Sequence, residues 1–289
     1  MKTSEASELG QFIPLHYHHH MLNDEARLSA FKAAIDLVVP VGGRVLELGS
    51  GTGVLSCFAA QRAAEVTAIE FNPQLVAASR VILEQNGCAE RVSVLQADAA
   101  IFTPDGPVDV VLCEMLHSAL LREKQLEIIR GFKLRYQARF DRLPCFIPEA
   151  TILAAQPVSQ DYNYQGYLAP LPHFQDAGSS HARSIERAMP NSYACVDYQD
   201  AFADRFEACL RFSITQACEI NAVRFITKNI LTIAPQAVHG IEWNNQHLVL
   251  PLQSPVGATD GSTIEVRFTY SAGGSIESLS ASLRCELVA

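Results

Sequence analysis

The sequence predicts an α/β domain with a doubly wound parallel sheet, followed by an antiparallel β domain. Between residues 44 and 116, short apolar stretches alternate with segments of helical spacing, which is typical of βαβ units. After about residue 150, alternating and β-branched stretches dominate and turn residues separate them, which is typical of an antiparallel sandwich or barrel. A chain of 289 residues is long enough for one large domain or two small ones.

A helix is expected over residues 20–39, where apolar side chains recur near helical spacing. Pro40, Gly42 and Gly43 end it. The later segments are expected to alternate between the two types: strand 44–49, helix 54–64, strand 65–70, helix 73–87, strand 91–98, strand 107–116 and helix 118–140. Such alternation builds a Rossmann-like sheet, which binds ligands outside the carboxyl ends of its strands.

The chain changes character at LPCFIPEATILAAQPV, residues 143–158. Stretches such as VRFITKNILTI and STIEVRFTYS follow it and predict an antiparallel β-barrel-like domain. Residues 155–205 are less regular and could form an insertion, a lid or an oligomerisation arm. We therefore divide the chain into N-terminal helices (1–40), a Rossmann-like domain (41–147) and a β-barrel-like domain (148–289).

The composition is acidic, with 31 Asp and Glu against 22 Lys and Arg and a net charge of -9. A nucleic-acid partner is not expected, because proteins that grip phosphates usually carry a basic patch or excess. A cationic substrate fits the charge better. The chain contains no run of about 18 apolar residues, so a membrane span is not expected. Nor is a signal peptide expected, because MKTSEASELG has acids where a signal peptide would be apolar.

The cysteines and histidines predict no metal site. The eight cysteines are scattered and form no CxxC pair, so we expect buried, reduced thiols and a cytoplasmic protein. The histidines of HYHHH, residues 16–20, are neighbours whose side chains point in different directions. No further ligands follow them at metal-binding spacing.

A glycine-rich loop ends the first predicted strand in VLELGSGTG. Gly49, Gly51 and Gly53 allow a tight turn and bring backbone N–H groups close to a ligand. The dinucleotide fingerprint would place its third glycine at Val54. The spacing found here, after the acidic Glu47, resembles the S-adenosylmethionine (AdoMet) binding loop of class I methyltransferases.

Two further acids follow at successive strand ends, and the same pattern implies a role for each. Glu70 ends the second strand and is expected to accept hydrogen bonds from the ribose hydroxyls. Asp98, with Ala99 beside it, ends the third strand and is expected near the adenine amino group. Either acid alone could equally be a helix cap or a solvated loop residue.

A second pair of acids points to a substrate. Glu114 and Glu123 flank a short apolar stretch after the fourth strand and lie nine residues apart. Two carboxylates in one cavity suit a guanidinium, which is planar, carries five donors and binds carboxylates in bidentate fashion. They would hold the cation and draw its charge away from the attacking nitrogen.

Several stretches resemble the protein arginine N-methyltransferase family. DVVLCEMLHSALLRE resembles its double-glutamate loop, and HHHMLNDEARLSAF its N-terminal stretch of the form H-x-x-M-L-x-D-x-x-R. The resemblance implies that Glu114 and Glu123 are catalytic, that His18 and Met21 close over AdoMet, and that Arg27 pairs with its carboxylate. It also implies a possible homodimer, because residues 155–205 lie where the family carries its dimerisation arm.

Beyond the first domain the resemblance is thinner. FIPEATILAAQPV resembles the junction where the family's sheet domain passes through a proline, here Pro148, into its barrel. VHGIEWNNQHLVL resembles the barrel loop of the form Thr-His-Trp. Trp243 and Glu242 are therefore expected on the substrate side, with Glu242 in place of the histidine.

The chain departs from the family mainly near the substrate. Met115 and Ser118 stand where the double-glutamate loop of the family has Trp and Tyr. The sequence therefore predicts methylation of a guanidino group, either arginine in a protein or a free arginine-like molecule. Two alternatives stay open: a methyltransferase for another N, O, C or S nucleophile of a small molecule or RNA, and a non-enzymatic binding protein.

Overall fold

The computed structural model describes residues 15–178, 181–233 and 240–288. The chain begins there with two helices, α2 (Leu15–Leu22) and α3 (Glu25–Val38). A single helix was expected over 20–39, but the two are separate because Asp24 caps α3. Its Oδ1 accepts the backbone N–H of Arg27 at 2.9 Å, which satisfies a donor in the first turn of the helix.

A five-stranded parallel sheet follows, in the order β3-β2-β1-β4-β5. Its strands are β1 (Arg44–Leu48), β2 (Glu65–Glu70), β3 (Val92–Gln96), β4 (Val110–Cys113) and β5 (Cys145–Ile147). The helices between them are α4 (Val54–Ala59), α5 (Pro73–Gln85) and α6 (Gln125–Phe140). The strand order reverses between β1 and β4, so a crevice is expected where their carboxyl ends meet.

The helix expected over 118–140 begins only at Gln125. Ahead of it lies the short 3-10 turn η1 (Ser118–Leu120). Ala119, Leu120 and Arg122 adopt positive φ angles of 57°, 53° and 62°, which an α-helix does not allow.

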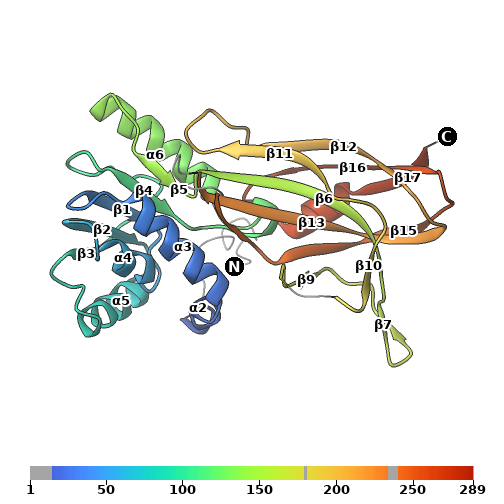
Figure 1. The fold of residues 1–289 in the computed structure, drawn as a ribbon, viewed down its shortest axis with the longest axis horizontal. Helices are drawn as coiled ribbons and strands as arrows, with labels where there is room; N and C mark the ends of the chain where they lie inside the picture. Colours follow the sequence, from blue (N-terminus) through green and yellow to red (C-terminus); the bar gives the residue numbers. More distant parts are fainter. Residues whose placement is uncertain (1–14, 179–180, 234–239, 289) are drawn as a thin grey trace, which may run out of the picture.

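The rest of the chain is antiparallel, and Figure 1 shows it at the opposite end of the molecule from the parallel sheet. The larger sheet has the order β10-β6-β13-β15-β9, with β11 on β6 and β14 on β13, and the smaller has the order β12-β16-β17. The strands are β6 (Ala150–Gln160), β9 (His173–Gln175), β10 (Ser184–Glu186), β11 (Asn191–Asp197), β12 (Arg205–Ser213), β13 (Cys218–Thr232), β14 (Ile241–Asn244), β15 (His247–Ala258), β16 (Thr263–Ser271) and β17 (Arg284–Val288), with helix α7 (Ile276–Ser282).

Aromatic rings join the two antiparallel sheets. Tyr193 of β11 and Phe225 of β13 meet Phe268 of β16, with ring centroids 4.9 and 5.0 Å from that of Phe268. These two contacts and the one between Tyr193 and Phe225 are edge-to-face, a geometry that aromatic pairs prefer. The parallel sheet followed by these packed antiparallel sheets is the α/β plus β-barrel-like fold that the sequence predicts.

Residues 155–205 are more regular than expected. β6 continues to Gln160, and β11 pairs with it in antiparallel register. Between them a hairpin of β7 (Asn163–Tyr164) and β8 (Tyr167–Leu168) turns through Gln165 and Gly166. Both turn residues have positive φ angles, 57° and 90°, as two-residue hairpin turns require. Small and polar residues within these strands weaken the alternation of apolar and polar side chains, so the sequence did not predict the strands.

The expectation that every cysteine is reduced is wrong for one pair. Cys57 of α4 and Cys88, which follows α5, form a disulfide with Cα atoms 5.8 Å apart. The two residues are 31 positions apart, so their spacing carried no signal. None of the helices within the described ranges is long and apolar enough to cross a membrane.

The parallel sheet ends at Ile147 and the antiparallel strands begin at Ala150. We propose the residues between them as the boundary of the two domains, and residue 40, just before β1, as the end of the N-terminal helices. Residues 1–14 of that helical part lie outside the described residues.

Candidate active site

A cavity of about 240 Å³ opens at the carboxyl ends of the parallel strands. Helix α2, the loops after β1, β2, β3 and β4, and the start of α6 all contribute to its wall. Most residues predicted from the sequence line it: His18, Met21, Arg27, Glu47, Gly49, Gly51, Glu70, Asp98, Ala99, Glu114 and Glu123. Gly53, Glu242 and Trp243 do not.

The glycine-rich loop forms the floor of this cavity. Gly49 and Gly51 adopt positive φ angles of 74° and 55°, and close neighbours leave them no room for a side chain. A Cβ on Gly49 would lie 3.1 Å from Sδ of Met115, and one on Gly51 would lie 3.0 Å from the ring of His18. Gly53 also has a positive φ angle, 81°, and a Cβ there would lie 3.1 Å from Leu83.

Three acidic side chains line the cavity beside the loop residues. Glu70 accepts the N–H groups of Gly51 and Asn72 at 2.9 and 2.8 Å. Asp98 accepts the N–H of Ala100 at 2.8 Å. Both acids make these loop bonds while they line the cavity. Glu47 is buried and accepts the hydroxyl of Ser56, and burial raises its pKa to about 8.

Helix α2 covers one side of the cavity. His18 and Met21 are partly buried against it, whereas His19 and His20 are exposed. Burial and the nearby Arg27 lower the pKa of His18, which favours its neutral form. Within the described part of the chain, His18 Nε2 and Ser50 Oγ are buried without a hydrogen-bond partner. Both belong to residues that line the cavity, so two polar atoms there could receive a bound cofactor.

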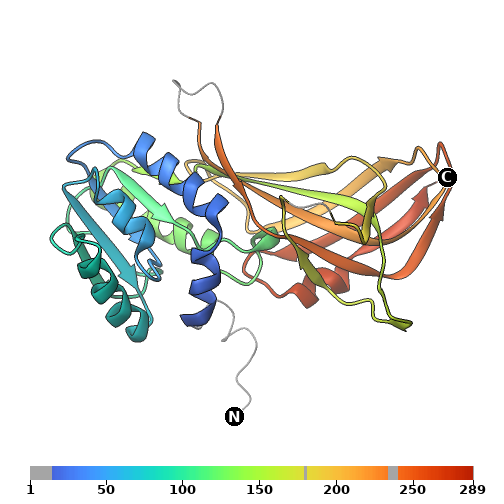
Figure 2. The same ribbon diagram turned by 60° about the horizontal axis from the view of Figure 1, so that its bottom comes forward.

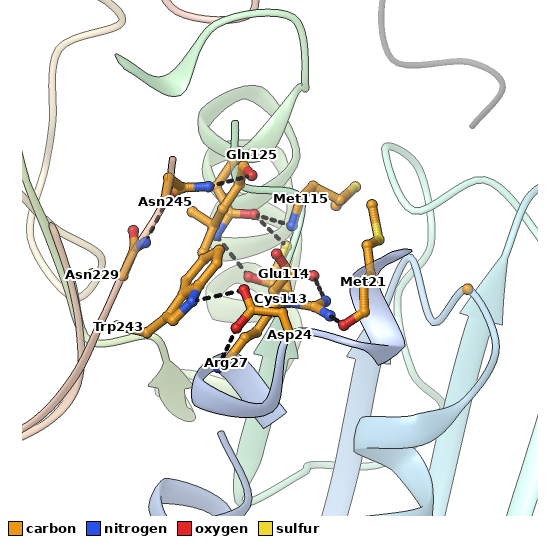
Figure 3. A network of polar contacts seen from close by, with 12 residues as sticks. Met21, Asp24, Arg27, Cys113, Glu114, Met115, Gln125, Asn229, Trp243 and Asn245 are labelled. Carbon is orange, nitrogen blue, oxygen red and sulfur yellow. Dashed lines mark hydrogen bonds and ion pairs between the residues drawn. The ribbon is translucent and has the colours of Figure 1, made fainter. Parts of the chain in front are cut away.

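Arg27 and Glu114 form a largely buried ion pair across the cavity (Figure 3). Their side chains are 8% and 12% exposed. Arg27 also donates to the carbonyl of Met21 at 3.2 Å, and its guanidinium lies 5.9 Å from the ring centroids of both Phe31 and Trp243. Burial raises the pKa of Glu114, and Arg27 opposes that rise.

Glu123 lies on the same cavity without such a partner. No side chain in the described ranges donates a hydrogen bond to its carboxylate, although Glu114 and Arg27 are near enough to interact with its charge. Burial, reinforced by the negative charge of Glu114, raises the pKa of Glu123 to about 8. Glu114 is therefore paired with an arginine, whereas Glu123 forms no ion pair within the described ranges, although Arg27 and Arg122 are near enough to act on its charge.

The two residues predicted on the substrate side lie outside the cavity wall. Trp243 of β14 contacts the site from outside this wall: its ring centroid lies 5.9 Å from the guanidinium of Arg27, and its Nε1–H donates to Oδ2 of Asp24 at 3.3 Å. Glu242 is exposed and pairs with Lys228 at 2.6 Å. Their place on β14 is beside the site rather than in it.

Three residues that the sequence did not predict support the site through hydrogen bonds to the backbone near its side chains: Asp24, Gln125 and Asn245. Asp24 had a local signal, since it stands three residues before Arg27 at the start of a predicted helix. Gln125 binds the backbone on both sides of Glu114, with Oε1 2.9 Å from the nitrogen of Met115 and Nε2 2.7 Å from the oxygen of Cys113. Asn245 had no signal, because it acts on a loop 129 positions away.

Residues 45–133 match the family described as "Methyltransferase domain". An uncharacterized protein of Methanothermobacter thermautotrophicus is 29% identical over 268 residues, which cover 92% of this chain and 97% of that protein. An arginine N(omega)-methyltransferase of Streptomyces achromogenes subsp. streptozoticus is 33% identical over 119 residues, covering 39% of this chain and 33% of that protein.

The fold has a close counterpart among solved structures. Protein arginine methyltransferase 10 of Arabidopsis thaliana superposes with a TM-score of 0.76 over 88% of this chain and 87% of that one, at 16% identity. The superposition therefore includes antiparallel strands as well as the parallel sheet. The superposition shows that the fold is shared. The matched domain and the similarity in sequence support a class I, S-adenosylmethionine-dependent methyltransferase that resembles the protein arginine N-methyltransferases.

Proposed function

We propose that the protein methylates a guanidino nitrogen, in a protein arginine or in a free arginine-like molecule. The observation that carries this proposal is the pair of acids on one cavity: Glu114 forms an ion pair with Arg27, whereas Glu123 forms no ion pair in the described residues. A guanidinium is planar and always charged, and it binds carboxylates through several N–H groups. It would supply the missing positive charge.

The lining residues suit AdoMet as the methyl donor. Glu70 stands at the end of β2 for a ribose, Asp98 at the end of β3 for an adenine, and Arg27 offers its guanidinium to a carboxylate. His18 and Ser50 each bring a buried polar atom without a partner. AdoMet, when bound, supplies an electrophilic methyl group on its sulfonium.

The protein's own contribution would be binding and orientation. Glu114 and Glu123 would fix the plane of the guanidinium and hold one nitrogen toward the cofactor, which converts an encounter into a positioned reaction. A carboxylate within hydrogen-bond reach could accept the proton that the methylated nitrogen releases. The cavity wall of α2 would exclude water from the site.

We propose further that the acceptor is not a nucleic acid, since the chain carries a net charge of -9. Six of the eight cysteines are free, which supports a cytoplasmic location, and the Cys57–Cys88 disulfide is the exception. The exposed hairpin β7–β8 supports a homodimer, because Tyr167 and Leu168 are 74% and 70% exposed and large apolar surface patches commonly mark an interface.

Product analysis tests the methyl acceptor. Labelled AdoMet would be incubated with free arginine, agmatine, an arginine-rich peptide and a hydroxyl acceptor, and the products identified by mass spectrometry. We expect methylated guanidine, and a loss of at least about 100-fold in turnover for Glu114→Gln and for Glu123→Gln, because an amide cannot neutralise the cation. Glu123→Gln should leave AdoMet affinity unchanged in calorimetry.

The exposed His19 provides the matched control for these variants. His19→Ala should keep wild-type turnover, because its side chain lies outside the cavity wall. Full activity in either glutamine variant, or label found only on the hydroxyl acceptor, would refute the guanidine assignment and favour another nucleophile.

A further inference from the structure

The loop that carries the two glutamates is held in an unfavourable backbone conformation. Ala119, Leu120 and Arg122 all have positive φ angles of 53° to 62°, and none of them is a glycine. Such angles cost energy in L-residues, and they persist only where the surrounding structure enforces them. Something outside this loop must therefore hold it.

Much of that support comes from the antiparallel domain. Thr227 of β13 accepts the N–H of Ala119 at 2.6 Å, and the Ser118 hydroxyl donates to the carbonyl of Gln246 at 2.5 Å. Asn245 donates through Nδ2 to the carbonyl of Leu116 at 2.9 Å. Leu116 is two residues after Glu114, so this bond holds the backbone close to a predicted catalytic side chain.

Asn245 is itself the end of a buried chain of polar side chains (Figure 3 shows the amides). Its Oδ1 accepts Nδ2–H of Asn229 at 2.8 Å, and Oδ1 of Asn229 accepts the hydroxyl of Thr151 at 2.9 Å. Tyr198 bonds to the same Thr151 hydroxyl at 2.9 Å. Asn245 is 7% exposed, and Asn229, Thr151 and Tyr198 are fully buried.

This series of hydrogen bonds fixes the orientation of the Asn245 side chain. A buried amide must find partners for both its donor and its acceptor, and Asn245 does so only in one orientation: the oxygen toward Asn229 and the nitrogen toward Leu116. Apolar packing would fill the same space without setting a direction. We call this series of hydrogen bonds, from Thr151 through Asn229 and Asn245 to Leu116, the relay. It connects β13 to the loop that bears Glu114 and Glu123.

We infer that Asn245 is a positioning residue, supported by Asn229, that sets the geometry of the two glutamates through the carbonyl of Leu116. This inference rests on the proposed function, because it assumes that the glutamates hold the acceptor. Asn245 is absent from the cavity wall, so it acts only through the loop. The antiparallel domain would then determine how accurately the acceptor is placed.

The test compares Asn245→Ala, Asn229→Ala and the double variant with Asn244→Ala. Asn244 is the neighbouring residue, and its side chain makes no hydrogen bond in the described part of the chain. With the acceptor that the wild type methylates, Asn245→Ala should lower kcat by about 10- to 100-fold, since small misplacements of reacting groups cost that much. The Kd for AdoMet in calorimetry should stay within about twofold, and Asn244→Ala should match the wild type.

The effects of the two substitutions on kcat show whether Asn229 and Asn245 act as one relay or independently. The double variant should lose no more kcat than Asn245→Ala alone, because both substitutions break one chain. A fully additive loss would overturn the relay, and equal kcat in Asn245→Ala and Asn244→Ala would overturn the positioning role. If Asn245→Ala fails to fold, the comparison of Asn229→Ala with Asn244→Ala decides by the same criterion.

Failure of the proposed function would look different. If the wild type methylates a non-guanidino acceptor, the same kcat comparison is made with that acceptor. If it methylates nothing in the screen, amide hydrogen exchange of residues 116–123 decides: Asn245→Ala should exchange faster there than Asn244→Ala, with AdoMet affinity unchanged. Equal exchange would overturn the inference independently of any activity.

Discussion

Glu114 and Glu123 share a cavity but differ in their surroundings. Glu114 faces Arg27 in an ion pair, which favours its charged form. Glu123 meets burial and the negative charge of Glu114, and its pKa rises to about 8. In the free protein at neutral pH, Glu123 is therefore mostly protonated, and binding a guanidinium would require it to lose that proton.

This raised pKa predicts the pH dependence of activity. The kcat/KM for a guanidino acceptor should rise with pH and level off above about 8, because only the carboxylate attracts the cation. Stability should change in the opposite sense. A folded-state pKa above the unfolded value of about 4.3 adds stability at low pH that is lost as pH rises through the folded pKa.

Two pH series check both parts. Initial rates at low acceptor concentration give the kcat/KM profile, and thermal melts give the stability profile. The Tm of Glu123→Gln should fall less than that of the wild type between pH 5 and 9, a window that follows from the pKa of about 8. Glu47 should titrate in both proteins with a pKa of about 8. A kcat/KM profile that is flat across pH 8 would contradict the prediction.

At the scale of elements, the break between α2 and α3 organises the cofactor side. Asp24 at this break caps α3 through the N–H of Arg27 at 2.9 Å and accepts the indole N–H of Trp243 at 3.3 Å. One carboxylate thus fastens the helix that carries Arg27 to β14 of the antiparallel domain. The position of the Arg27 guanidinium depends on that attachment.

Asp24→Ala should therefore have two effects. Loss of the cap should lower the free energy of unfolding by about 0.5–2 kcal/mol, as measured by urea denaturation. AdoMet affinity should also fall several-fold in calorimetry, because Arg27 loses its support. Asp36→Ala is the control: Asp36 pairs with Lys32 at 2.7 Å on the exposed face of the same helix, where such pairs contribute only about 0.3–0.5 kcal/mol. Equal losses of AdoMet affinity in the two variants would argue against the attachment.

At the scale of the whole molecule, the β7–β8 hairpin projects away from the antiparallel sheets in both views (Figures 1 and 2). Tyr167 and Leu168 at its end are 74% and 70% exposed. Leaving such side chains in water forfeits about 25 cal/mol for each Å² of apolar surface that could be buried. A second copy of the chain is the partner we propose for this hairpin.

Light scattering after size-exclusion chromatography should thus give twice the 31.6 kDa mass of one chain. The double substitution Tyr167→Ser and Leu168→Ser should shift the protein toward monomer while Tm stays near the wild-type value. Val41→Ser removes a side chain that is 81% exposed elsewhere and should leave the dimer intact. A wild-type monomer at every concentration would rule out this assembly.

The sequence by itself determined what depends on local order along the chain. The alternation of strands and helices predicted the parallel sheet, and the β-branched stretches predicted the antiparallel domain. Hydrophobic period and glycine spacing are local properties, so they can be read from a window of about 11–18 residues. The same patterns selected the acids and glycines that line the cavity, since these lie at strand ends that meet at one edge of the sheet, whereas His18, Met21 and Arg27 came from the resemblance of their stretch to a known family.

Only the tertiary structure decided which partners those residues have. Arg27 meets Glu114 across 87 positions, Asn245 meets Leu116 across 129, and Trp243 meets Asp24 across 219. Glu242 and Trp243, which the sequence predicts on the substrate side, do not line the cavity. A hydrogen bond depends on distance and direction in space, and no local period along the chain encodes either one between separate domains.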